Sequence, residues 1–163
     1  MRGITARQTA RLLSLAFLTL ALGLVHAQAK TDFSGTWKLN TAKSDFGAMP
    51  PPDAMTQKIT HGDPSLKANV VSTGGMYGDM TYDVAYTTDG KECVNHVGEG
   101  EFKSTLKWDG DSLAVDIKGS FGGNEFTAKD RWTLSSDGKT LTITQHFTSA
   151  MGEGDIKEVF DKQ

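Results

Sequence analysis

Apolar residues recur at every second position over most of the chain after residue 30. In the first such run, Phe33, Trp37 and Leu39 fall in phase with Gly35. A period of two is typical of β-strands with one buried face, whereas a helix repeats every third or fourth residue. Seven more runs follow this pattern, at 66–70, 80–86, 102–108, 113–121, 126–134, 141–147 and 156–160. The pattern predicts an all-β domain without a helix of useful length.

The turns between these runs are short and rich in Asp-Gly. T-D-G-K at 88–91, W-D-G-D at 108–111 and S-D-G-K at 136–139 supply the positive φ angles that tight hairpins need. Links of this length join neighbouring antiparallel strands, whereas a Greek-key sandwich needs longer crossings. We therefore expect an up-and-down antiparallel β-barrel of about 8–10 strands, closed by the last strand on the first and free of exposed edges. A sandwich is the alternative.

One connection is long. Residues 41–54 contain three consecutive prolines, which forbid a continuing strand or helix. This segment either crosses the barrel mouth with Phe46 or Met49 turned inward, or forms a solvated loop. The Gly-rich segment 73–79, with Met76 and Tyr77, is a second candidate for the rim of the mouth.

The N-terminus has the pattern of an export signal. Three arginines in the first 11 residues precede an apolar run from Leu12 to Val25, which ends in V-H-A-Q-A. The run is shorter than the ~20 apolar residues of a spanning helix. We expect residues 1–27 to be a signal peptide, cleaved after Ala27 or Ala29. The remaining 28–163 form a lipocalin-like barrel domain, periplasmic or secreted, with no membrane insertion.

The charge composition of the chain limits the classes of molecule that it is expected to bind. The expected signal peptide holds three of the 17 basic residues and none of the 20 acidic ones, which leaves 14 against 20 and a formal net charge of −6. An acidic chain with scattered lysines lacks the surface that displaces counterions from nucleic acid, so no nucleic-acid partner is expected. No protein partner can be named. Cys93 is the single cysteine, and a small buried apolar side chain is favoured over a reactive thiol.

The stretch F-S-G-T-W-K-L-N, Phe33 to Asn40, resembles the first strand of the calycins, the superfamily of lipocalins and fatty-acid-binding proteins. The continuation K-S-D-F-G with prolines is similar to small exported bacterial lipocalin-like proteins. The resemblance implies a barrel in which Trp37 closes one end of a ligand-sized space. Gly35 is expected to bend the strand or to let another segment approach closely.

The resemblance also implies arginines that this chain lacks. In lipocalins the equivalent tryptophan packs against an arginine of a late strand, and fatty-acid-binding proteins hold the ligand carboxylate with buried arginine and tyrosine. Here Arg131 is the single arginine after residue 27. It alternates with Asp130 and Trp132, which places it on the outer face. Phe160 occupies the late tyrosine position, with Glu158 two residues before it.

Alternation assigns several polar side chains to the inner face, where they need partners. They are Asn95, Ser104, Asp130, Gln145 and Glu158, with the hydroxyls of Tyr82 and Tyr86. Either they form an internal network with water, or they orient a ligand. Because the set is acidic and amide rather than cationic, we expect a neutral, hydroxylated or amine-bearing ligand rather than a fatty-acid anion.

Motifs for metal binding and catalysis are absent from the sequence after residue 27. His61, His96 and His146 lack metal-ligand spacing, and there is no G-x-S-x-G. We expect no cofactor and no enzymatic activity. A haem-binding barrel, or an acid–base enzyme built on Asp130 and Glu158, is a weaker alternative.

The sequence thus favours an exported, non-enzymatic barrel that binds a small apolar, neutral ligand. The alternative is a structural or protein-interaction module whose barrel is filled by its own side chains. The residues expected to line or close the ligand space are Trp37, Tyr82, Tyr86, Phe102, Ser104, Trp108, Phe121, Asp130, Trp132, Gln145, Phe147 and Glu158.

Overall fold

The computed structural model describes residues 30–163, so the expected signal peptide and both cleavage sites lie outside the described residues. The described chain contains ten strands and one short 3-10 turn, η1 (Thr41–Lys43). The strands are β1 (Gly35–Leu39), β2 (Ala54–Gly62), β3 (Ser65–Thr73), β4 (Met80–Thr87), β5 (Asp89–Val97), β6 (Gly100–Asp109), β7 (Ser112–Phe121), β8 (Asn124–Leu134), β9 (Thr140–Ser149) and β10 (Gly152–Lys162).

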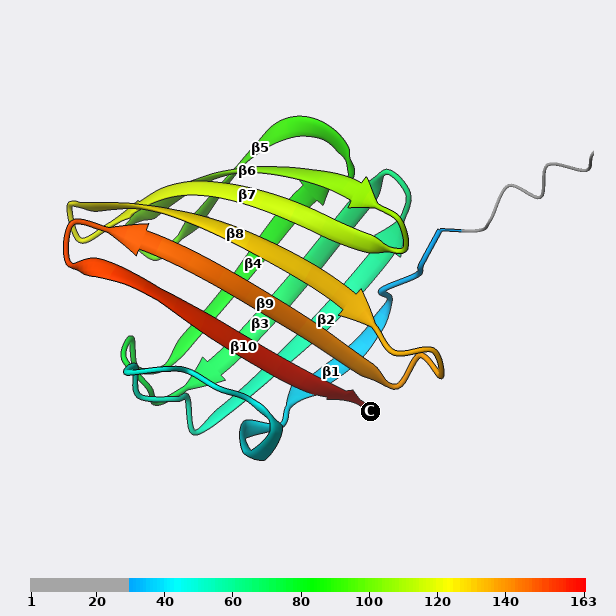
Figure 1. Cartoon of the computed structure of the whole chain (residues 1–163), viewed down its shortest axis with the longest axis horizontal. Helices are drawn as coiled ribbons and strands as arrows, with labels where there is room; N and C mark the ends of the chain where they lie inside the picture. The colour runs from blue at the N-terminus through cyan, green and yellow to red at the C-terminus, as the bar shows by residue number, and fades with distance from the viewer. Residues whose placement is uncertain (1–29) are drawn as a thin grey trace, which may run out of the picture.

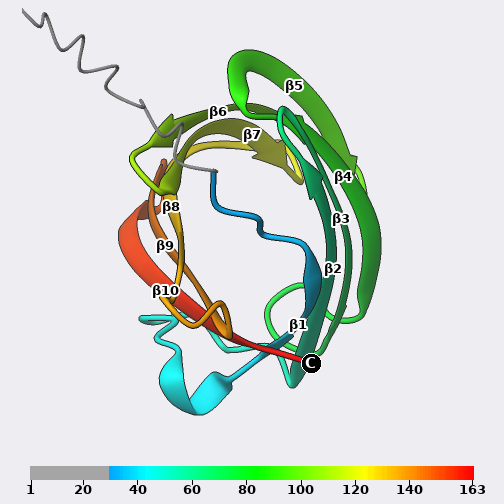
Figure 2. The ribbon, with the colours of Figure 1, turned by 90° about the vertical axis from the view of Figure 1, so that its right-hand side faces the viewer.

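The strands form one antiparallel sheet that curls into a barrel (Figures 1 and 2). Each strand pairs with the next along the chain, except for β4 and β5, and β10 pairs with β1 through registers such as Trp37 opposite Lys162. The predicted up-and-down barrel, with its last strand closed on its first, is confirmed. Of the described residues, none belongs to a helix long and apolar enough to cross a membrane.

The barrel has a seam between β4 and β5, which lie side by side without a backbone ladder (Figure 2). The expectation of a barrel without free edges is therefore wrong at this place. The Asn95 amide takes the place of a paired strand: its oxygen accepts from Ala85 N (2.8 Å) and its nitrogen donates to Ala85 O (3.1 Å). The Cys93 sulfur accepts from Thr87 N (3.2 Å). Side chains of β5 thus satisfy part of the backbone edge of β4.

Strands β2 and β5 are absent from the runs predicted by alternation. Their inward positions carry polar residues, with Gln57 and His61 on β2 and Cys93 and Asn95 on β5. Since the apolar period is broken at these positions, the pattern of apolar residues in these two strands is weak. Both strands are held in the sheet by backbone pairing, β2 with β1 and β3, and β5 with β6.

A dense hydrophobic core fills the end of the barrel where β1 closes on β10. Phe33, Trp37 and Phe160 are fully buried there. The Trp37 indole donates to Phe33 O (2.9 Å), and Lys162 Nζ lies 5.1 Å from the Trp37 ring centroid. A lysine of the last strand therefore contacts the tryptophan for which the resemblance implied an arginine partner. Gly35 (φ +148°) makes room, since a Cβ there would lie 2.7 Å from the Lys162 stem.

Candidate ligand-binding cavity

The other half of the barrel is hollow. A cavity of about 730 Å³ extends from the core to the opposite end of the barrel, a volume in the ~300–1,000 Å³ range of small-molecule sites. The alternative of a barrel filled by its own side chains is therefore wrong. The sequence-predicted residues that line the cavity are Tyr82, Tyr86, Phe102, Ser104, Asp130, Trp132, Gln145, Phe147 and Glu158.

The other predicted site residues lie elsewhere. Trp37 and Trp108 belong to the packed core at the closed end of the barrel, and neither lines the cavity. Trp108 stacks on Phe33 at 6.1 Å between centroids and donates from its indole to Asp63 (2.8 Å). Phe121 ends β7, and its side chain is not among those described.

The floor of the cavity is Trp132, which separates the core from the hollow half. Its ring meets Phe33 edge-on at 6.2 Å and Tyr86 edge-on at 6.4 Å. The indole nitrogen of Trp132 approaches Asp130 closely enough to lower the pKa of that carboxyl slightly, yet it makes no hydrogen bond of normal geometry. A buried donor at the floor thus lacks a satisfactory partner.

Two glycines in the wall give room to phenyl rings that line the cavity. Gly119 lies opposite Phe126, and Gly154 lies opposite Phe147, on paired strands. A Cβ at Gly119 would come within 2.7 Å of the Phe126 ring, and one at Gly154 within 2.8 Å of the Phe147 ring. The tip of each phenyl ring therefore occupies space that a side chain at the glycine position would need.

The mouth of the cavity is bordered by the two segments predicted for it. Phe46 and Met49 of the long loop line the cavity, and Phe46 also packs against the core, so this loop crosses the mouth rather than standing free in solvent. Met76 and Tyr77 line the rim and are exposed. The two loops touch, with Asp53 N donating to Thr73 O (2.8 Å).

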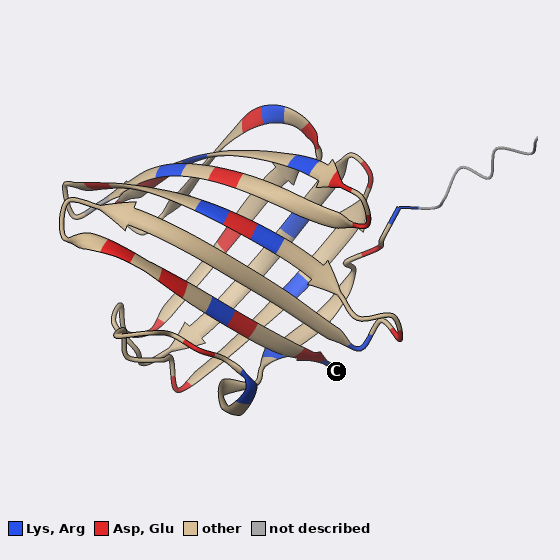
Figure 3. Ribbon diagram, viewed as in Figure 1, with Lys and Arg blue, Asp and Glu red and all other residues tan. Residues whose placement is uncertain are grey.

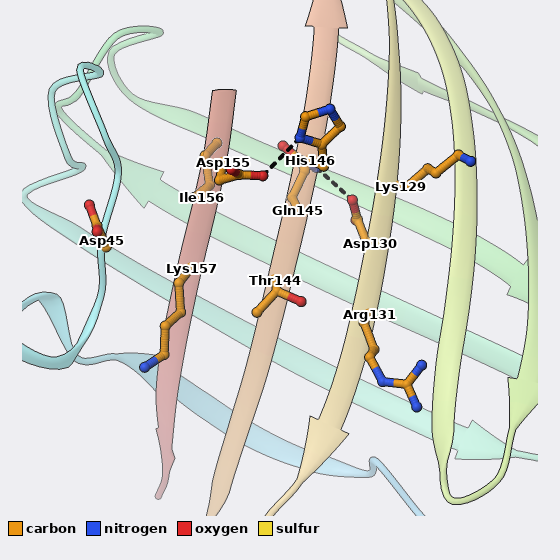
Figure 4. Close-up of a pocket in the computed structure, with 10 residues that line it drawn as sticks. All are labelled: Asp45, Lys129, Asp130, Arg131, Thr144, Gln145, His146, Asp155, Ile156 and Lys157. Carbon is orange, nitrogen blue, oxygen red and sulfur yellow. Dashed lines mark hydrogen bonds and ion pairs between the residues drawn. The ribbon is translucent and has the colours of Figure 1, made fainter. Parts of the chain in front are cut away.

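Two carboxylates lie deep inside the cavity. Burial raises the pKa of Asp130 to about 6, against the opposing effect of a hydrogen bond from Gln145 Nε2 (2.9 Å; Figure 4). Burial, and then the nearby charge of Asp130, raise the pKa of Glu158 to about 7. Both side chains are enclosed by protein but keep some accessible surface, because that surface faces the cavity. Burial therefore favours the protonated form of both carboxyls relative to carboxyls in water.

The tyrosine hydroxyls of the cavity also lack partners. Burial, and then the charge of Glu158, raise the pKa of Tyr82 to about 12. Burial likewise raises the pKa of Tyr86, so both remain protonated hydroxyl donors. Within residues 30–163 neither hydroxyl makes a hydrogen bond. Together with Glu158 they form a set of polar groups available to a bound molecule.

The cationic residues near the site face away from it. Lys129, Arg131 and Lys157 border a second, shallow hollow on the outer wall of β8–β10, drawn in Figure 4. Arg131 is exposed and pairs with Asp109, as its phase predicted. His146 pairs with Asp155 at 2.8 Å on the same wall. Acidic and basic positions are interspersed along the strands (Figure 3), without a single-sign stripe.

Some residues that line the cavity were not predicted, because no predicted run covered their positions. Met55 and Gln57 of β2 line the cavity, as does Ser72 of β3, and no predicted run covered them. The alternation Met55, Gln57, Ile59 carries a weak signal that could have found β2. Residues 30–163 contain no group of three or more His, Cys, Asp or Glu side chains that could hold a metal ion.

Comparison with known proteins gives matches among solved structures only. No protein-family model matches the chain, and no curated protein matches it. Several solved structures match most of the chain. Zebrafish ileal bile acid-binding protein in complex with cholic acid matches with a TM-score of 0.57 at 16% identity, covering 82% of this chain and 100% of that one. Secretory abundant heat soluble protein 4 of Ramazzottius varieornatus matches with a TM-score of 0.54 at 16% identity, covering 84% and 99%.

Human cRBP IV gives a TM-score of 0.51 at 18% identity, covering 82% of this chain and 99% of that one. At such identities the likeness concerns the fold alone. It extends over the whole barrel of each compared protein, in agreement with the sheet order and the closure of β10 on β1. The chain accordingly has the fold of the calycin superfamily.

Proposed function

We propose that this protein is a non-enzymatic carrier that binds a small, largely apolar molecule inside the barrel. The observation that supports it is the cavity of about 730 Å³, with walls formed mainly by apolar and aromatic side chains. Cavities of this kind bury most of the surface of a small ligand and use a few polar groups to orient it. A protein of similar fold, the zebrafish bile acid-binding protein, is complexed with cholic acid, which is in keeping with this proposal.

The charges in the cavity limit the class of ligand. The charged residues that line it are Glu125, Asp130, Glu153 and Glu158, and among the described residues no Lys, Arg or His joins them. A carboxylate ligand would meet like charge in a medium of low dielectric, which is strongly unfavourable. We therefore propose a ligand without an acidic group. A neutral hydroxylated molecule and an amine both meet this condition.

Titration with Nile red, a neutral apolar fluorophore, tests this function. Saturable binding of one dye per chain is expected. Ser104→Phe places a ring inside the cavity and should weaken binding about tenfold or more, whereas Lys103→Phe, on the outer face of the same strand, should leave it unchanged. Equal dye binding by both variants, with both folded by circular dichroism, would contradict binding inside the barrel.

We further propose that the protein acts after export, in the periplasm or the medium. The support is the signal-like pattern of residues 1–27. N-terminal sequencing of the protein from its natural host tests this, with Gln28 or Lys30 expected as the first residue. A chain that retains the apolar run from Leu12 to Val25 would contradict it.

A further inference from the structure

The carboxylates of the cavity differ in what surrounds them. Glu125 and Glu153 are exposed at the mouth, where water solvates them. Asp130 lies deep but accepts a hydrogen bond from Gln145. Glu158 also lies deep, and no hydrogen bond or ion pair involves its side chain anywhere in residues 30–163. It is therefore the one enclosed carboxylate, among the described residues, that has no partner.

An enclosed carboxylate without a partner is costly, and different ligands relieve this cost differently. Water and hydroxyl groups can donate hydrogen bonds, but neither brings the opposite charge that a carboxylate in a low-dielectric site requires. An ammonium group brings both a positive charge and up to three donors. Asp130, whose charge acts on Glu158, would then share the same cation.

We propose that the ligand carries a basic nitrogen on an apolar body, and that Glu158 binds the resulting ammonium group with Asp130 as a second carboxylate. This rests on the proposed function and narrows its ligand class. The groups that face Glu158 fit the arrangement: Asp130 on β8 is anionic, and Tyr82 on β4 offers an uncharged hydroxyl. An amine that enters as the free base takes its proton from protonated Glu158, and the pair then has no net charge.

Three probes of one chain length separate this inference from the proposed function. Dodecylamine, dodecanol and dodecanoate share an apolar tail and differ in head group, and each is titrated at pH 7 below its micellar concentration by calorimetry. We expect the amine to bind about tenfold or more tighter than the alcohol, and dodecanoate to bind most weakly. Equal affinities for amine and alcohol would overturn the inference and leave the carrier function standing. Absence of binding by all three would overturn both.

Matched variants then locate the effect. Glu158→Gln keeps the shape of the side chain and removes its charge, so it should weaken dodecylamine binding about tenfold and change dodecanol binding less than about twofold. Dodecanol binding thus reports that the variant is folded. Asp116→Asn makes a matched change on the exposed outer wall of β7, away from the cavity, and should leave both affinities within about twofold. If Asp116→Asn weakens amine binding as much as Glu158→Gln, general attraction by negative charge replaces the proposed contact, and the inference fails.

Discussion

The two halves of the barrel differ in how far their polar groups are paired. In the closed half the Trp37 indole donates a hydrogen bond inside the buried core and the Trp108 indole donates one to Asp63 at its exposed edge. The buried His61 Nε2 of this half has no hydrogen-bond partner among the described residues. Asp63 there accepts from Thr88 and Trp108, and these bonds lower its pKa to about 2. In the hollow half Glu158 and the Tyr86 hydroxyl have no partner in the described chain. The closed half provides stability, and the hollow half retains unmet bonding capacity that a guest can use.

The largest expected effect is at the closed end. Trp37→Ala removes a fully buried indole and leaves a void between β1 and β10, so we expect a loss of about 3–5 kcal/mol in the free energy of unfolding. Met151→Ala, at the open end, changes a side chain that is 85% exposed and should cost less than about 0.5 kcal/mol. Urea unfolding followed by circular dichroism compares the two. Similar losses would mean that stability is not concentrated in the closed half.

A second test uses pH to probe the hollow half. The pKa of Glu158 is raised from 4.5 to about 7 in the folded state, so the folded protein holds this proton more tightly than the unfolded chain. Its contribution to stability is therefore complete below about pH 4.5 and is lost as pH rises through about 7, by on the order of 3 kcal/mol. Glu158→Gln should flatten this decline and be the more stable protein at pH 8.

Urea unfolding of both proteins from pH 4 to pH 8 measures this difference. Asp116→Asn, on the exposed outer wall of β7, is the control and should keep the slope of the wild type. If Glu158→Gln loses stability between pH 5 and 8 as steeply as the wild type, the carboxylate is better solvated than its position indicates.

A smaller effect is expected at the seam between β4 and β5, where Asn95 borders the hollow half. Asn95→Ala removes both side-chain bonds to Ala85, and we expect a loss of about 1–2 kcal/mol together with faster hydrogen exchange of the Ala85 amide. Asn69→Ala removes an exposed side-chain bond to Asp83 on the neighbouring strand pair and should cost less than about 0.5 kcal/mol. Unchanged exchange at Ala85 in Asn95→Ala would show that the amide bridge does not hold the seam.

The alternation of apolar and polar residues was sufficient to predict which residues of most strands face the inside of the barrel. It placed Asp130, Gln145 and Glu158 on the inner face and Arg131 on the outer face, because a strand with one buried face leaves only two choices for each residue. Trp37 was placed at a closed end from its phase and its resemblance to calycins. These predictions depend on local geometry, which the sequence encodes directly.

What the sequence did not reveal depends on contacts between distant segments. At the seam the Asn95 side chain bonds to the backbone of β4. The sequence of β5 has no apolar period from which this contact could be predicted. Lys162 over Trp37 requires the register between the first and last strands. Likewise, alternation predicts that Phe126 and Phe147 point inward, but not that each ring lies against a glycine of the paired strand.

The contacts of these two rings with glycine have a consequence for the range of ligands that such a barrel could hold. At Gly119 and Gly154 one added methyl group would collide with a phenyl ring of the cavity, so the ring would have to move. Pairing between strands would stay intact, since only a side chain swings. Single substitutions at these wall positions would thus change the width of the ligand that fits the cavity. They would do so independently of the carboxylates that select the head group.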